Sequence, residues 1–194
     1  HKLVSEITNI EFVVVNSEFD ALLLENSLIK ENQPKYNILL KDDKSFPSIC
    51  ITNERFPRIY STRRLEAEAG QYFGPYTSVK AIDNVLDLIR KLYKIRTCQY
   101  DLSKRNIEKG KFKVCLEYHL GNCKGPCENL QSEDEYMNEI QGAHHILKGN
   151  LGLVKTELKS RMDEFATNLN FEMAQTFKTK LEYLEKFQSK STIV

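Results

Sequence analysis

Apolar and polar positions along the chain form three successive units. In the first, Ile10 to Val15 is an almost continuous apolar run of the length expected for a buried strand. Ser17 is suited to cap a following helix, with Asp20 three residues later, and the helical pattern runs to about Glu31. The first unit is therefore predicted to be a strand followed by a helix.

The second unit mixes short strands with longer helices. Strands are predicted at Ser48 to Thr52 and Arg58 to Thr62, and a Gly/Pro turn at Tyr72 to Tyr76. Thr77 is expected to cap a helix, and Ser132 with Glu135 is a capping box for another helix that ends near Gly149. The apolar positions of the first of these helices keep a helical period: Val79, Ile82, Val85, Leu86, Ile89 and Leu92.

The third unit carries two long apolar stripes at helical spacing, separated only by Asn168 to Asn170. The stripes consist of Val154, Leu158, Met162, Phe165 and Leu169, then Phe171, Ala174, Phe177, Leu181, Leu184 and Phe187. This pattern predicts two antiparallel helices. A lone helix pair buries little of two such stripes, so the pair is expected to pack either on the rest of the chain or on a partner helix pair.

These elements predict an α+β protein with three parts: residues 1–40, a cysteine-rich region at 41–150, and a helical hairpin at 151–194. The chain has 194 residues and begins at His1, so it is expected to be a piece of a longer protein. The net charge of +1 hides a basic middle: residues 30–124 hold 19 Lys and Arg against 11 Asp and Glu, or +8. This excess favours a polyanion such as duplex DNA as partner, although an unevenly charged solvated surface has the same composition.

Four cysteines lie within thirty residues, at Cys98, Cys115, Cys123 and Cys127. Converging thiolates are the ligands of structural zinc and of four-iron clusters, and the spacing does not choose between the two. Disulfides are disfavoured because the chain shows no apolar leader and the total of five cysteines is odd. Cys50 lies in an apolar run and is expected in the core. His119, His144 and His145 could also serve zinc, although the adjacent pair is more typical of a solvated helix face.

Glu25 is a carboxylate with apolar helical neighbours. Ala21, Leu22, Leu28 and Ile29 stand at the positions three and four residues away on both sides. Such a glutamate either reaches solvent at the edge of the stripe or is held by a cation, for example a divalent metal in a phosphodiesterase site.

Several motifs, in the same order along the whole chain, resemble the UvrC family of bacterial nucleotide excision repair. They are Asp20 to Lys30, Gln33 to Asn37, Lys41 to Pro47, Tyr72 to Tyr76, Arg96 to Cys98, and Cys115 to Cys127. The resemblance implies the second half of a GIY-YIG nuclease domain at the start of the chain, a four-iron, four-sulfur cluster on the four cysteines (with zinc as the alternative), and a UVR hairpin that binds UvrB.

The resemblance also implies roles for single residues. Glu25 matches the metal-binding glutamate of the family, which holds Mg or Mn, and Asn37 matches its active-site asparagine. The expected UvrB contacts are Phe165, Leu169, Phe171, Ala174 and Leu181.

The implied activity is that of a cytoplasmic, metal-dependent endonuclease of the SOS response, which incises damaged DNA on both sides of a lesion. The GIY and YIG strands would precede His1, and a helix-hairpin-helix and a second nuclease domain would follow Val194. The chain alone is therefore expected to be inactive. The alternative is a non-catalytic zinc or iron–sulfur adaptor that binds DNA; a redox carrier has no support beyond the cysteines.

Overall fold

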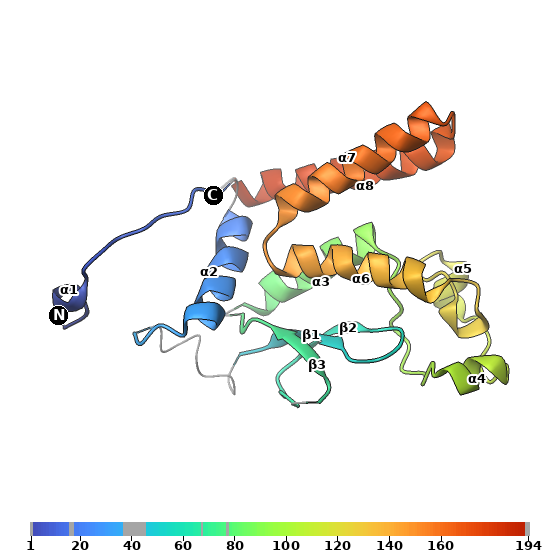
Figure 1. The fold of residues 1–194 in the computed structure, drawn as a ribbon, viewed down its shortest axis with the longest axis horizontal. Coiled ribbons are helices and arrows are strands. Elements are labelled where there is room, and N and C mark those ends of the chain that lie inside the picture. The colour runs from blue at the N-terminus through green and yellow to red at the C-terminus, as the bar shows by residue number, and fades with distance from the viewer. Residues whose placement is uncertain (1, 16–17, 37–45, 67, 77, 193–194) are drawn as a thin grey trace.

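A computed structural model describes residues 2–15, 18–36, 46–66, 68–76 and 78–192 of the chain (Figure 1). The strands are β1 (Ser48–Thr52), β2 (Ile59–Thr62) and β3 (Gly70–Phe73). The helices are α1 (Lys2–Glu6), α2 (Glu18–Asn32), α3 (Val79–Leu92), α4 (Lys104–Glu108), α5 (Leu116–His119), α6 (Glu133–Leu147), α7 (Leu151–Thr167) and α8 (Phe171–Thr192), with a 3-10 turn η1 at Pro126–Glu128. No helix in these ranges is long and apolar enough to span a membrane.

The three strands form one antiparallel sheet with β1 in the centre. Cys50 lies opposite Tyr60 on one side and Tyr72 on the other. All five residues of β1 are buried, including the apolar residues Ile49 to Ile51 at its centre, which confirms Cys50 as a core residue. The mixed α/β architecture and the two predicted strands are therefore confirmed.

The sheet, the pair α3 and α6, and the pair α7 and α8 lie in successive layers (Figure 1). α3 begins at the N-cap Ser78, whose hydroxyl accepts a hydrogen bond from the Ala81 N–H at 3.4 Å. α6 has the predicted capping box, in which Ser132 and Glu135 each bond the backbone N–H of the other. The buried face of α3 contributes much of the single core through Ile82, Val85, Leu86, Leu88, Ile89 and Leu92.

α7 and α8 pack along each other, and the three residues between them are those predicted as the turn. The end of this pair near the body carries the buried residues Val154, Leu158 and Leu184. At this end, the apolar stripes of both helices are therefore buried against the rest of the chain. The opposite end, which carries the turn, rises away from α6 (Figure 1).

Three local predictions are wrong. Ile10 to Val15 is not a strand: it is extended away from the body, and Phe12 is 86% exposed (Figure 1). A strand needs a neighbour to pair with, and no described strand lies beside this segment. The turn predicted at Tyr72 to Tyr76 overlaps β3, which ends at Phe73. The N-cap of α3 is Ser78 and not Thr77. Thr77 and Ser17 lie outside the described residues.

Candidate metal centre and partner surface

The four clustered cysteines lie on the loops that connect α3 to α6. Cys98 follows the end of α3, Cys115 is the N-cap of α5, Cys123 follows α5, and Cys127 lies in η1. Cys127 is buried and the other three are half-buried. Four thiols from separate short elements are thus brought to one region of the molecule.

Tight turns between the cysteines depend on glycine. Gly125 has a φ of 74°, a conformation that L-residues with a side chain rarely adopt. A Cβ at this position would lie 3.0 Å from atoms of Tyr118 and of Leu130. The turn between Cys123 and Cys127 therefore requires glycine for its conformation and for the close packing around it.

The thiols influence one another electrostatically. Burial raises the pKa of the Cys123 thiol; the Gly125 N–H, 3.5 Å from the sulfur, lowers it, and the Cys98 and Cys115 thiols raise it further. Burial also raises the pKa of Cys127, with further increases from Cys123, Cys98 and Cys115. Cys123 therefore lies within electrostatic reach of Cys98 and Cys115, and Cys127 within reach of the other three thiols, so that each thiolate formed here disfavours the next.

The thiols are near one another but are not arranged as a finished metal site. Within the described ranges, no three His, Cys, Asp or Glu side chains are grouped in a way that would hold a metal ion. The four thiols still fit a thiolate-bound metal, because two of the sulfurs have hydrogen-bond donors beside them. The Gly125 N–H lies 3.5 Å from the Cys123 sulfur, and the Arg96 guanidinium lies 3.7 Å from the Cys98 sulfur.

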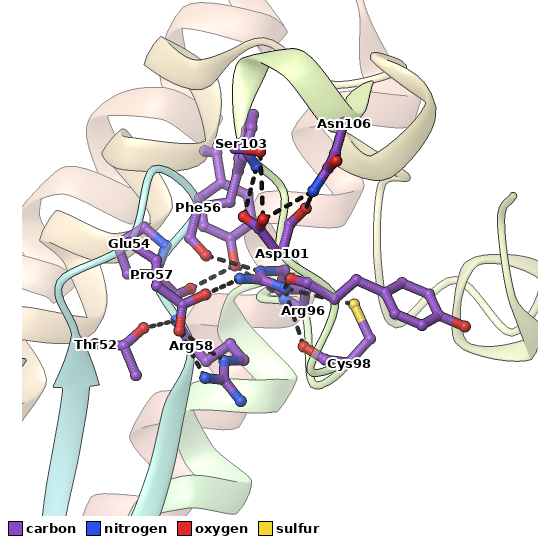
Figure 2. Close-up of polar contacts among 12 residues, drawn as sticks. Thr52, Glu54, Phe56, Pro57, Arg58, Arg96, Cys98, Asp101, Ser103 and Asn106 are labelled. Carbon is purple, nitrogen blue, oxygen red and sulfur yellow. Dashed lines mark hydrogen bonds and ion pairs between the residues drawn. The ribbon is translucent and has the colours of Figure 1, made fainter. Parts of the chain in front are cut away.

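Arg96 is the residue that ties Cys98 to the sheet, and sequence reasoning did not identify this role. Its side chain is 1% exposed and forms an ion pair with Glu54 in the connection between β1 and β2. It also donates to the Phe56, Cys98 and Tyr100 carbonyls at 2.7, 3.0 and 2.8 Å. Figure 2 shows these contacts converging on the guanidinium. In the sequence, the motif Arg96 to Cys98 marks this arginine, but only the fold shows that its side chain is buried.

The Arg96 network extends to α6. The Arg96 N–H donates to the Tyr136 hydroxyl at 3.1 Å, and that hydroxyl donates to the Pro57 carbonyl at 2.7 Å. Tyr136 is fully buried, with its ring edge-on to Phe56 at 5.2 Å between centroids. The loop that carries Cys98 is therefore fixed to both the sheet and α6.

His144 and His119 make aromatic contacts and show no electrostatic effect on the two cluster cysteines with shifted pKa values. His144 packs edge-on against Phe73 at 5.4 Å, and burial lowers the pKa of its imidazole. His119 lies on the exposed side of α5, edge-on to Tyr118. Neither is among the groups that shift the pKa of Cys123 or Cys127.

The predicted nuclease residues lie on and after α2. Glu25 is exposed, and Ile29, four residues later, is buried where α2 packs against α8. Asn37 lies outside the described residues. The roles predicted for Glu25 and Asn37 therefore stay predictions.

The five predicted UvrB contacts differ in exposure. Leu169 and Phe171, which flank the turn between α7 and α8, are 74% and 66% exposed. Phe165 stacks on Phe177 with 5.4 Å between ring centroids, Ala174 is buried, and Leu181 packs against the core. The free apolar surface is thus at the tip of the helix pair.

Comparison with known families finds two matches, both to domains of one class of excinuclease proteins. Residues 46–146 match the UvrC/Cho excinuclease middle domain, and residues 1–38 match the UvrC-like GIY-YIG domain. Because the first match covers more than half of the chain, the chain belongs to the UvrC family.

The similar curated proteins are full-length members of this family. The UvrABC system protein C of Flavobacterium johnsoniae is 55% identical over 192 residues, and those of Christiangramia forsetii and Bacteroides fragilis are each 52% identical. Each alignment covers 99% of this chain and 32% of the relative, so the chain spans about a third of the length of these proteins. No solved structure matches significantly.

Proposed function

We propose that the chain is part of the UvrC subunit of an excision-repair endonuclease, which incises damaged DNA on both sides of a lesion. The observation that carries this proposal is the similarity to UvrABC system protein C along 99% of the chain, at 55% identity. Within that protein, the chain would contribute cluster binding, DNA contact and docking of UvrB, in the cytoplasm. Each of the three parts of the chain would have its own role in this function.

Residues 1–40 would belong to the GIY-YIG nuclease domain, in agreement with the match at residues 1–38. Glu25 would hold a divalent cation, Mg or Mn, which supplies positive charge at the scissile phosphate. Its exposed position on α2 leaves the carboxylate free to bind a cation. Asn37 would complete this part of the active site.

The middle part would hold a four-iron, four-sulfur cluster, or alternatively zinc, on Cys98, Cys115, Cys123 and Cys127. Burial, and after it the neighbouring thiols, raise the pKa values of Cys123 and Cys127, so a bound cation would be needed to stabilise the thiolate forms that serve as metal ligands. Arg96 would hold Cys98 in position, and the Gly125 N–H would donate to the Cys123 sulfur.

The helix pair α7 and α8 would be the UVR motif that binds UvrB. Its exposed tip, with Leu169 and Phe171, supports this role because large apolar side chains exposed together favour a protein partner. Phe165, Ala174 and Leu181 would be the remaining UvrB contacts, and they are less exposed than the tip.

The experiment that tests the nuclease assignment replaces Glu25 in the full-length protein. With UvrA, UvrB and a lesion-containing duplex, Glu25→Ala should abolish one of the two incisions and leave the other. Glu31→Ala, an exposed glutamate on the same helix, is the matched control and should leave both incisions intact. Two unchanged incisions in Glu25→Ala would contradict the assignment and favour the non-catalytic DNA-binding adaptor.

A further inference from the structure

Residues 99–114, which connect Cys98 to Cys115, form a segment that we call the basic arm. The arm includes α4 and lies at the end of the molecule far from α1 and α2 (Figure 1). No role follows for it from the cysteine cluster, the helix pair or the nuclease residues.

The arm carries an excess of exposed positive charge. It holds five Lys and Arg against two Asp and Glu, a net charge of 5 − 2 = +3. All five cations are exposed: Lys104, Arg105, Lys109, Lys111 and Lys113. Arg105, Lys109 and Lys111 form no ion pair within the part of the chain that the structure describes.

The two acidic residues of the arm do little to neutralise it. The Asp101 carboxylate accepts hydrogen bonds from the Ser103 N–H at 3.1 Å and from the Asn106 amide at 2.8 Å, so it shapes the start of α4 (Figure 2). Glu108 lies 3.9 Å from Lys104, and both side chains are largely exposed, which makes a weak pair. The charge on the outer surface of the arm therefore stays positive.

The arm is attached to the body at both ends. The Tyr100 carbonyl accepts from buried Arg96 at 2.8 Å, and the Val114 N–H donates to Glu128 at 2.9 Å. Across the arm, the Tyr100 and Phe112 rings stack at 4.4 Å with an angle of 7° between them, and Phe112 packs against the core. Tyr100 is 41% exposed. The cations are thus displayed on an anchored loop beside an exposed aromatic ring.

We infer that the basic arm binds the phosphodiester backbone of DNA through Arg105, Lys109 and Lys111. This inference rests on the proposed function, which supplies DNA as the polyanion. Like charges that are held close together and lack acidic partners repel one another, and a row of phosphates relieves this repulsion while releasing counterions. The exposed Tyr100 ring adds a surface on which an unpaired base can stack.

The test uses the full-length protein with Arg105, Lys109 and Lys111 all changed to Gln. Affinity for a short duplex and for a single strand of equal length is measured by fluorescence anisotropy at several salt concentrations. The slope of log affinity against log salt on duplex should become shallower by about 2.7, because three phosphate contacts are lost at about 0.9 each. The matched control changes Lys155, Lys159 and Arg161 on α7 to Gln and should leave the slope unchanged.

A second variant, Tyr100→Phe, keeps the stacked pair, while Tyr100→Ala removes the ring. If a base stacks on Tyr100, Tyr100→Ala should weaken single-strand binding by roughly tenfold, with little change on duplex. If Tyr100→Ala lowers the affinity for single strand and duplex equally, no base stacks on Tyr100 and the basic arm binds backbone phosphates only. Circular dichroism checks that the variants are folded.

Two results would overturn the inference: an unchanged salt slope in the triple variant, or an equal change in the α7 control. Either result leaves the proposed function intact if Glu25→Ala still abolishes one incision. If instead the triple variant loses DNA affinity as expected while Glu25→Ala changes neither incision, the basic arm stands and the nuclease assignment fails.

Discussion

At the scale of single residues, the buried side chain of Arg96 connects the loop of Cys98 to the sheet. A guanidinium that is 1% exposed loses its hydration, and the Glu54 carboxylate and three carbonyls replace the lost water contacts. Residues 40 or more positions apart are thereby joined, so the loop of Cys98 is held to the sheet by contacts that involve no metal ligand. The expected consequence is that Arg96 stabilises the fold and also positions Cys98.

Arg96→Met should destabilise the chain by about 3–5 kcal/mol, because it leaves the Phe56, Cys98 and Tyr100 carbonyls without their donor, while Glu54 keeps its ion pair with Arg58. The measurement is urea unfolding followed by circular dichroism. Arg90→Met is the control: Arg90 is 58% exposed with a loose contact to Asp87 at 3.4 Å, and its replacement should cost less than about 0.5 kcal/mol. Equal effects of the two substitutions would show that the buried network adds no stability.

At the scale of elements, the helix pair α7 and α8 has two different ends. Leu184 is completely buried and Leu158 nearly so, which fixes the pair to α3 and α6. At the other end, Phe171 is exposed next to the turn. Stability and partner binding are therefore expected to depend on different parts of the same two helices.

Phe171→Ala should weaken binding to the C-terminal segment of UvrB by about thirtyfold, or about 2 kcal/mol, without loss of helix content. Isothermal titration measures the affinity and circular dichroism the helix content. Phe177→Ala is the contrast: it removes the ring stacked on Phe165 and should lower the free energy of unfolding by about 3 kcal/mol. If Phe171→Ala binds UvrB with unchanged affinity and intact helices, the tip is not the docking surface.

Elements with local signals were predictable from the sequence. The α3 stripe and the capping box at Ser132 depend on residues three and four positions apart, so short-range spacing is sufficient. Strand assignments depend on distant partners. The apolar run that ends at Val15 has no strand beside it among the described residues, whereas β3 was missed because Gly74 and Pro75 made its end look like a turn.

The candidate site was predictable only in part, for the same reason. The spacing of the four cysteines indicated a shared site, and the structure brings them within electrostatic reach of one another. Burial of an arginine has no sequence pattern of its own, because its partners Glu54 and Phe56 lie some 40 positions away. The exposure of Phe171 relative to Leu181 also depends on how far the helix pair extends beyond the body.

At the scale of the whole molecule, the chain covers 32% of its full-length relatives and carries one predicted metal ligand of the nuclease. One carboxylate and one amide cannot position water, metal and phosphate together. The 194-residue chain is therefore expected to give no incision of damaged DNA, with or without Mg or Mn. Gel analysis of a labelled duplex, with the full-length protein as positive control, checks this. Metal-dependent nicking that Glu25→Ala abolishes would contradict it.

The central claim is that Cys98, Cys115, Cys123 and Cys127 together hold one metal centre, and metal content tests it most directly. Anaerobically prepared Cys123→Ser should lose the bound metal, whereas Cys50→Ser, which changes the buried thiol of β1, should keep it. Iron and zinc analysis with a visible absorption spectrum gives the answer. Iron with an absorption band that bleaches in air would identify the cluster, and zinc alone would identify the structural-zinc alternative. Full metal content in Cys123→Ser would contradict the claim.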